Sequence, residues 1–408
     1  MKVCVVGSGG REHALVDALS RTAEVVITPG NPGIAESVAD RPEDIEADLY
    51  VIGPEAPLVD GLADRLRAMG RVVFGPGADG ALLEGSKAWM KEVVAAAGVP
   101  TASYATFEDL DDALGFLAGM VPPFVIKTDG LAAGKGVLVT DSLTEARNAV
   151  GDYLSGHAFG EAGRRVVIEE GLSGPELSVL AVCDGNKGVL LAPAQDFKRV
   201  GDGDNGPNTG GMGAYSPVPF VNDELLQEVQ DNFITPTLAE LRKRGIDYRG
   251  VLYAGLMLTP SGLKLIEYNV RFGDPETQVV LPRFDGDLAN LLLEAANGDL
   301  RTEPQFHDEA CVTVVCAAQG YPSTPRSGDV ISGIADAEAA DGVNVYCAGV
   351  TTNDDGQLVT SGGRVLNVTA TGETLAAARA RAYEAAARIS WEGMFHRSDI
   401  AAEAAAQT

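Results

Sequence analysis

The sequence has few cysteines and histidines and no long hydrophobic run. No apolar stretch approaches the roughly 20 residues needed to cross a bilayer. The N-terminal MKVCVVGSGG reads as a buried strand that runs into a glycine turn, and it lacks the apolar core of a signal peptide. We therefore predict a cytoplasmic protein with no membrane partner, and we expect no fused second enzyme after the C-terminal unit.

The cysteines form no recognisable disulfide or zinc pattern. Their number is odd and none belongs to a C-x-x-C motif. Most lie in apolar, strand-like stretches, which indicates buried, reduced thiols in a reducing compartment. The five are Cys4, Cys183, Cys311, Cys316 and Cys347.

Positive charge is also scarce. The chain carries 31 Lys and Arg against 58 Asp and Glu, a net charge of −27. Such a surface repels nucleic acid and anionic membranes, so we exclude both as partners. A phosphate site must then be built locally from Lys, Arg, metal and backbone N–H groups. Either a high-salt cytoplasm or an acidic, Ala- and Gly-rich genome bias explains the acidity.

Residues 1–100 alternate between strand and helix patterns. Buried strands are expected in VCVVG, VVITPG, LYVIGPE and VVFGPG, with a short amphipathic helix over residues 11–20. Continuous apolar strands separated by helices favour a parallel, doubly wound sheet. The turns after the strands would line up along one edge of this sheet, where ligands bind. They fall at Gly7, Gly30, Gly53 and Gly75.

The pattern changes after about residue 122, beyond a helix at 86–98 that Ser86 caps. PFVIKTDGLAAGKGVLVT reads as strand, glycine-rich loop and strand. A helix over 143–154 and a second strand pair complete a small α+β unit. The polar, glycine-rich segment 196–219 reads as a functional loop, docked through the apolar residues near its end. Residues from about 308 onward look mostly β.

The most informative motif is Glu267-Tyr268-Asn269-Val270-Arg271, at the end of an expected strand. Because side chains alternate along a strand, Glu267, Asn269 and Arg271 should share one face while Tyr268 and Val270 pack on the other. Carboxylate and amide oxygens suit Mg²⁺, and a guanidinium can grip an anion with two hydrogen bonds. The row therefore predicts a phosphate-transfer site, with a solvated edge strand as the alternative.

Two lysines flank the glycine-rich loop of the small unit. Lys127 ends a strand and Lys135 lies in the loop, so both could cover nucleotide phosphates, although the Walker spacing is absent. The exposed backbone around Glu169, Glu170 and Leu172 could meet an adenine edge. Glu176, a few residues further on, could accept hydrogen bonds from ribose hydroxyls.

The first turn argues against a dinucleotide enzyme. Gly7-Ser8-Gly9-Gly10 follows a strand and opens a helix, where N–H groups can hold a phosphate. The spacing departs from G-x-G-x-x-G because Glu12 occupies its last position, and no acidic residue follows at the distance expected for a ribose. A phosphorylated small molecule fits better than NAD. We expect His13 to pack and not to catalyse.

Together these segments resemble the glycinamide ribonucleotide synthetases (phosphoribosylamine–glycine ligases), ATP-grasp enzymes of purine biosynthesis. The matching stretches span nearly the whole chain, and PNTGGMG and RFGDPETQ are the most specific. They are GSGGREHAL at 7–15, GPEAPLVDGLAD at 53–64, EGSKAWMK at 84–91, IKTDGLAAGKGV at 126–137, GPNTGGMGAYSP at 206–217, LYAGLM at 252–257 and NVRFGDPETQ at 269–278.

The resemblance implies a multidomain α/β and α+β fold. It implies a Rossmann-like N-terminal domain at 1–101, an ATP-grasp core at 102–305 with a lid at about 122–187, and a β-rich C-terminal domain at 306–408. The implied reaction joins glycine to 5-phosphoribosylamine at the expense of ATP, through glycyl phosphate. We expect only small-molecule partners and a monomer or weak dimer.

The resemblance also assigns roles to individual residues. Lys87 and Lys127 would contact ATP phosphates, with Lys135 closing over them; Glu169, Glu170 and Leu172 would frame adenine, and Glu176 the ribose. Glu267 and Asn269 would hold Mg²⁺ or Mn²⁺, and Arg271 the moving phosphoryl group. Asp196 would receive the glycine ammonium. The implied substrate contacts for phosphoribosylamine and its surroundings are Gly9, Gly10, Pro54, Glu55, Thr209 and Gly210.

Two positions depart from the family pattern, and a third segment departs from many other ATP-grasp proteins but not from this family. Phe197 stands where histidine is expected, and Asn367 where glycine is usual. Tyr253-Ala254-Gly255 replaces an acidic metal ligand found in many ATP-grasp proteins, which suggests few protein ligands to the metal. Two rival functions remain open: another ATP-grasp carboxylate–amine ligase, or a non-catalytic nucleotide-binding relative.

Overall fold

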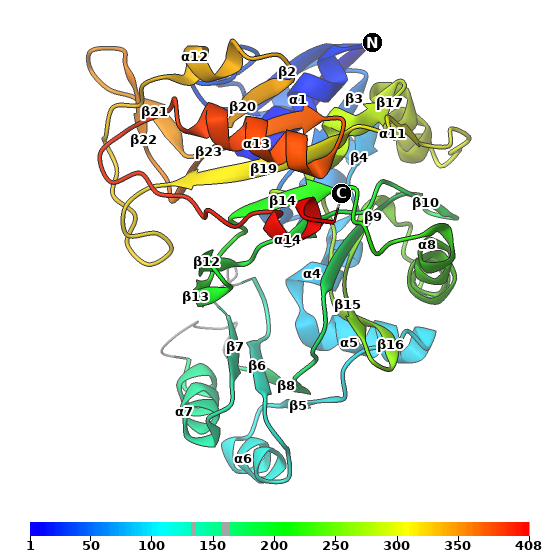
Figure 1. Ribbon diagram of the computed structural model, residues 1–408. Coiled ribbons are helices and arrows are strands. Elements are labelled where there is room, and N and C mark those ends of the chain that lie inside the picture. The colour runs from blue at the N-terminus through cyan, green and yellow to red at the C-terminus, as the bar shows by residue number, and fades with distance from the viewer. Residues whose placement is uncertain (132–135, 157–163, 408) are drawn as a thin grey trace.

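The computed structural model describes residues 1–131, 136–156 and 164–407. Figure 1 shows the N-terminal sheet beside the C-terminal sheet in the upper part of the molecule, with the central sheet below them. A small unit of strands and helices projects at the lower end. Among the described residues, no helix combines the length and apolar character that a membrane crossing requires. All five cysteines are free and buried, as expected.

The N-terminal unit contains the predicted parallel sheet, in the order β2-β1-β3-β4. Gly30 N–H donates to Gly7 O at 3.0 Å and Gly53 N–H to Val6 O at 2.9 Å, so these turns meet at one edge of the sheet. The strands are β1 (Lys2–Gly7), β2 (Glu24–Pro29), β3 (Leu49–Ile52) and β4 (Val73–Phe74). The helices are α1 (Gly10–Ser20), α2 (Glu55–Val59), α3 (Leu62–Ala68) and α4 (Ala78–Gly85).

The central sheet is antiparallel, in the order β10-β9-β15-β16. Its strands are β9 (Glu176–Asp184), β10 (Gly188–Leu190), β15 (Arg249–Thr259) and β16 (Gly262–Asn269). The fourth N-terminal turn is tied to this sheet, because Gly75 N–H donates to Arg249 O at 3.0 Å. The α-helices of residues 87–297 outside the small unit are α5 (Lys87–Ala97), α8 (Asp223–Val229), α9 (Thr235–Lys243), α10 (Thr277–Val280) and α11 (Leu288–Asn297), of which α10 packs against α1 and the C-terminal sheet.

Helix α5 begins and ends as its sequence predicts. The Ser86 hydroxyl accepts from Trp89 N–H at 3.1 Å and so caps the first turn. Gly98 closes the helix with φ of 73°, a left-handed conformation that glycine adopts without steric cost. These two caps fix Lys87 in the first turn of the helix.

The small unit has its own sheet and its own hydrophobic core. Its strands run in the order β5-β8-β6-β7, and it spans residues 104–170. It therefore begins before the lid range expected at about 122–187, and β9 lies in the central sheet instead. The elements are β5 (Tyr104–Phe107), α6 (Leu110–Ala118), β6 (Phe124–Thr128), β7 (Val137–Thr140), α7 (Leu143–Leu154) and β8 (Val166–Glu170).

The C-terminal sheet recruits two strands from the middle of the chain. Its order is β11-β14-β19-β23-β20, formed by β11 (Gln195–Asp196), β14 (Gly213–Ser216), β19 (Ala310–Ala317), β20 (Val343–Cys347) and β23 (Arg364–Gly372). Helix α13 (Leu375–Ala386) packs on β19 and β23. Short pairs complete this part: β17 (Phe284–Asp285) with β18 (Gln305–Phe306), and β21 (Val350–Thr352) with β22 (Leu358–Thr360). The last helices are α12 (Ile334–Glu338) and α14 (Ala402–Ala405).

The prediction of an irregular loop over 196–219 was only partly right. Residues 199–208 form a hairpin of β12 (Arg199–Gly201) and β13 (Asn205–Asn208), and β14 is a buried strand of the C-terminal sheet. Gly213 permits the close packing of β14, since a Cβ there would lie 2.7 Å from Thr313 O. The glycines of this segment therefore include one needed for close backbone packing in a strand, and not only residues of turns.

Candidate active site

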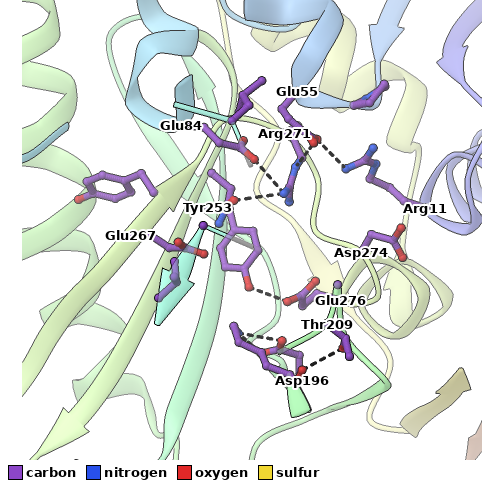
Figure 2. Close-up of a pocket in the computed structure, with 18 of the residues that line it drawn as sticks. Arg11, Glu55, Glu84, Asp196, Thr209, Tyr253, Glu267, Arg271, Asp274 and Glu276 are labelled. Atoms are coloured by element: carbon purple, nitrogen blue, oxygen red, sulfur yellow. Dashed lines mark hydrogen bonds and ion pairs between the residues drawn. The ribbon is translucent and has the colours of Figure 1, made fainter. Parts of the chain in front are cut away.

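Strand β16 carries the row of polar side chains that its sequence predicts. Tyr268 and Val270 face the core and are 1% and 0% exposed. Glu267 and Asn269 face the opposite way and, with Arg271 just beyond the strand, line a cavity of about 420 Å³ (Figure 2). The N-terminal, central and C-terminal units all contribute to its wall. The polar residues that line it include Arg11, Glu55, Glu84, Lys87, Asp196, Lys198, Thr209, Tyr253, Asp274, Glu276, Tyr321 and Arg364.

Arg271 is fixed by acidic side chains from two other elements. Its Nη2 donates to Glu84 Oε1 at 2.9 Å and to Asn269 Oδ1 at 3.1 Å, while Nε donates to Glu55 Oε2 at 3.3 Å. Burial opposes the charge, but Glu84 and Glu55 raise the pKa of Arg271 above its already high value. The guanidinium is therefore a fixed cation, held between two carboxylates in Figure 2.

Glu267 is the charged side chain at the end of this strand that faces the cavity. Within the described part of the chain, its carboxylate makes no hydrogen bond or ion pair. Burial would raise the pKa of Glu267, but the lysines around it and Arg271 together hold that pKa below its usual value. The ionised carboxylate and the Asn269 carbonyl beside it are hard oxygen ligands.

These two residues fit a magnesium-type ion bound largely by its substrate. The described residues contain no group of three or more His, Cys, Asp or Glu side chains arranged to hold a metal. Mg²⁺ is commonly bound by one or two carboxylates, with water and substrate phosphates completing its shell. Glu267 and Asn269 match that pattern.

Lys87 is the cation of this cavity that lacks a carboxylate partner among the described residues. Its Nζ donates only to Gly130 O, at 3.2 Å. Burial lowers the pKa of Lys87, although Glu267 opposes that effect. The ammonium thus lines the cavity without a direct ion pair to a described carboxylate, which leaves it able to bind a phosphate.

Glu169 lies between two buried lysines. Its Oε1 is 3.1 Å from Lys91 Nζ and 3.1 Å from Lys127 Nζ. Lys127 also donates to Ile266 O at 3.2 Å, next to Glu267 on β16. The carboxylate of Glu169 is therefore engaged with lysines, and only the backbone near it is left to meet a base. Lys135 lies outside the described residues.

The other residues assigned to the nucleotide have diverse surroundings. Glu170 accepts from Lys264 at 3.1 Å and from Ser103 N–H at 2.9 Å. Leu172 is half-buried in the turn between β8 and β9. Glu176 forms an ion pair of 3.0 Å with Lys198.

Asp196 lies in an acidic corner of the cavity. Lys198 Nζ donates to both of its carboxylate oxygens, at 2.7 and 2.8 Å. Glu276, the other buried acid here, accepts from Tyr253 OH at 2.6 Å. Burial raises the pKa of Asp196, and the nearby charge of Glu276 adds to that effect. Lys198 carries one positive charge, which cannot neutralise both Asp196 and Glu276.

Thr209 and Gly210 are held from the C-terminal side. Thr209 Oγ1 donates to Lys198 O at 2.9 Å. Gly210 N–H donates to Tyr321 OH at 3.0 Å, and Arg364 Nη1 donates to Gly210 O at 2.5 Å. Arg364 also binds Asp274 Oδ2 at 2.9 Å, so it connects the two loops that carry the specific motifs.

The first turn lies beside the cavity. Pro54 and Glu55 line it, whereas Gly9 and Gly10 are not among the lining residues. A side chain at Gly10 would collide with the buried amide of Asn367, the residue that replaces the family glycine. His13 packs as expected: its Nδ1 accepts from a backbone N–H at 2.9 Å, and burial lowers its pKa to about 4.

Several lining residues carried no usable signal in the sequence. Tyr321 and Arg364 belong to none of the quoted motifs, and Glu84 begins the stretch at 84–91 but was assigned no role; all three reach the cavity through the fold. Asp274 and Glu276 could be seen as carboxylates in the turn after β16, but nothing local indicated their partners Arg364 and Tyr253.

Three domain descriptions match the chain in succession. Residues 1–84 match the phosphoribosylglycinamide synthetase N domain, residues 85–277 its ATP-grasp (A) domain and residues 311–403 its C domain. A domain of 2-oxoglutarate carboxylase from Hydrogenobacter thermophilus, a biotin carboxylase domain, shares the fold with a TM-score of 0.72 at 17% identity, over 97% of this chain and 91% of that one. The expected α/β, ATP-grasp fold class is thereby confirmed.

Relatives of known name are similar over the full length. The phosphoribosylamine–glycine ligase of Streptomyces coelicolor is 50% identical, over 99% of this chain and all of its own. That of Escherichia coli O6:H1 is 50% identical over 98% of each chain. The crystal structure of the Thermotoga maritima enzyme superimposes with a TM-score of 0.88 at 38% identity, covering 98% of this chain and 100% of that one. This chain belongs to the phosphoribosylamine–glycine ligase (phosphoribosylglycinamide synthetase) family.

Proposed function

We propose that this chain joins glycine to 5-phosphoribosylamine with ATP, giving glycinamide ribonucleotide, ADP and phosphate in purine biosynthesis. The observation that carries the proposal is the unpaired charge at one cavity. Among the described residues Glu267 makes no hydrogen bond or ion pair and Lys87 donates only to a backbone carbonyl, and both line this cavity. A metal and a nucleotide phosphate are the ligands that match these two charges.

The nucleotide would lie between the small unit and β16. Lys87 and Lys127, with Lys135 from the glycine-rich loop, are the cations we assign to its phosphates. Glu267 and Asn269 would hold Mg²⁺ or Mn²⁺, which would neutralise charge on the phosphates when bound. Arg271 stabilises the transferring phosphoryl group because its position is fixed before reaction. We assign adenine to the backbone around Glu169, Glu170 and Leu172, and ribose to Glu176.

Phosphorylation activates the glycine carboxylate for attack by an amine. A carboxylate acylates an amine poorly because its leaving group would be oxide. Transfer of the γ-phosphoryl group to a glycine carboxylate oxygen forms glycyl phosphate and ADP. The amine of phosphoribosylamine then attacks the carbonyl carbon, loses a proton, and expels inorganic phosphate. Exclusion of water protects the intermediate from hydrolysis, and we propose the unit of residues 104–170 as the lid that excludes it.

The acidic corner suits the ammonium group of glycine. Asp196 and Glu276 are buried there together, and Lys198 is shared between Asp196 and Glu176. A second cation is the charge that this corner lacks. We therefore assign the glycine ammonium to Asp196.

Phosphoribosylamine would occupy the side formed by the N-terminal and C-terminal units. Pro54 and Glu55 approach from one side, and Thr209 and Gly210 from the other. Gly9 and Gly10 would complete this cradle from behind. We retain the division into domains at 1–101, 102–305 and 306–408, a cytoplasmic location, and a monomer or weak dimer.

An omission assay tests the reaction. Release of ADP should require Mg²⁺-ATP, glycine and phosphoribosylamine together, with glycinamide ribonucleotide detected by mass. ADP formed without glycine would indicate a different ATP-grasp ligase. Tight ATP binding with no ADP would indicate a non-catalytic relative.

Glu267→Gln tests the metal site. It keeps the shape of the side chain but removes the charge, so half-maximal ADP release should need at least about 10-fold more Mg²⁺. Glu338→Gln, which removes a partly buried carboxylate in the C-terminal unit, is the matched control and should leave this concentration unchanged. An unchanged requirement in Glu267→Gln would remove its assigned role.

Lys87 should impose an alkaline limit on ATP use. Its folded-state pKa lies below the ordinary 10.5, so as pH rises it loses its proton before an exposed lysine would. The kcat/KM for ATP depends on the protonation of groups in the free enzyme, so it should fall at alkaline pH. Lys87→Arg should move the fall to higher pH because a guanidinium stays charged. An alkaline fall at the same pH in the wild type and in Lys87→Arg would contradict the assignment.

A further inference from the structure

The hairpin β12–β13 connects two pairs of cavity residues. Asp196 and Lys198 precede it, and Thr209 and Gly210 follow it. Residues 202–207 at its tip are exposed. With so little apolar burial of its own, the hairpin needs another source of order if the residues at its two ends are to keep their positions.

Arg397, nearly 200 residues further along the chain, supplies contacts to this hairpin. It is 2% exposed, and its Nη1 donates to Asp204 Oδ1 at 2.7 Å and to Arg199 O at 3.0 Å. Its Nε and Nη2 donate to Asp399 at 2.7 and 2.6 Å. The buried guanidinium thus bonds to β12, to the turn of the hairpin and to its own segment.

The next two residues extend the contact, and we call residues 397–399 the clasp. Ser398 N–H donates to Asp202 Oδ1 at 2.8 Å. Gly203 N–H donates to Asp399 Oδ2 at 2.8 Å. Burial opposes the charge of Asp399, but its bonds from Arg397 and Gly203 lower its pKa to about 2, so the clasp keeps its charges at neutral pH.

The clasp has a firm support. Tyr383, on α13, donates through its OH to Arg397 O at 2.8 Å. Arg379, on the same helix, donates to Ile400 O at 2.8 Å and to Ser398 O at 2.5 Å. Because α13 packs on two strands of the C-terminal sheet, the clasp connects the hairpin to the most extensive sheet of that unit.

Phe197 adds an apolar contact on the same side. Its ring lies 4.9 Å from the Arg397 guanidinium, a cation–π distance. Asp196, one residue earlier, lines the cavity. The phenylalanine that replaces the expected family histidine therefore places an uncharged ring against a buried cation, where a protonated histidine would repel it.

We propose that Arg397 is a positioning residue: through the 397–399 clasp it fixes the hairpin and thereby holds Asp196 and Thr209 in place for glycine and phosphoribosylamine. The proposal rests on the substrate assignments made above. The residues assigned to the ATP phosphates and to the metal lie away from the hairpin, on the small unit, α5 and β16, whereas Glu176 on β9, assigned to the ribose, pairs with Lys198 beside it.

Steady-state kinetics of the full chain provide the test. Arg397→Met should raise KM for glycine and for phosphoribosylamine at least about 10-fold, with KM for ATP changed by less than about 2-fold. Arg397→Lys should restore part of the loss, because it keeps the charge but not the planar fork. Asp204→Asn should change the same two constants more weakly; asparagine tolerates the left-handed φ of 54° at this position.

The matched control is Arg326→Met. Arg326 also pairs with two acids of the C-terminal unit, Asp329 at 2.8 Å and Glu392 at 2.9 Å, but it does not line the cavity. It should leave all three KM values unchanged. Amide hydrogen exchange over residues 199–210 should accelerate in Asp204→Asn and not in Arg326→Met. This measurement tests the contacts of the clasp independently of enzyme activity.

Each result decides the proposal. Higher KM values for glycine and phosphoribosylamine, together with faster amide hydrogen exchange in the hairpin, support it. Equal changes in all three KM values, or unchanged KM and exchange in Asp204→Asn, overturn it; Asp204→Asn decides alone if Arg397→Met does not fold. A wild-type chain that makes no ADP would count against the proposed function, and hydrogen exchange would still decide the clasp.

Discussion

The alternation of side chains along β16 determines where both the core and the chemistry lie. Tyr268 and Val270 are buried on one face, and their packing leaves Glu267 and Asn269 on the other, at the cavity. A slip of one residue in pairing with β15 would exchange the two faces and place a carboxylate in the core. Burial of Tyr268 and Val270 therefore stabilises the central sheet and also determines the face of β16 on which the proposed metal ligands lie.

The electrostatics of the cavity follow from the shortage of positive charge in the chain. Most cations are already matched: Arg271 by Glu84 and Glu55, Arg364 by Asp274, and Lys198 by Asp196 and Glu176. These pairs fix the geometry of groups that would otherwise move. Against this background Lys87 and Glu267 differ, because neither forms a direct ion pair with another described residue, and we propose that ligands complete their contacts. A pre-organised site of this kind stabilises developing charge without rearranging during the reaction.

Local patterns predicted the elements well and their distant contacts poorly. The caps of α5, the bounds of α7 and the two faces of β16 depend on neighbouring residues, so the sequence indicated them. The engagement of Glu169 with Lys91, the reach of Arg364 to Gly210 and the burial of β14 depend on segments brought together by the fold. Nothing in PNTGGMG indicates that its last glycine begins a strand of the C-terminal sheet. Family resemblance could assign roles to such residues but not their partners.

The central claim is that the cavity makes a phosphorylated glycine before carbon–nitrogen bond formation. Glycine labelled with ¹⁸O in its carboxylate tests this directly. If glycyl phosphate forms, the oxygen that received the phosphoryl group leaves with it, and each turnover delivers one labelled oxygen to inorganic phosphate. Inorganic phosphate free of label, with glycinamide ribonucleotide still produced, would contradict the account.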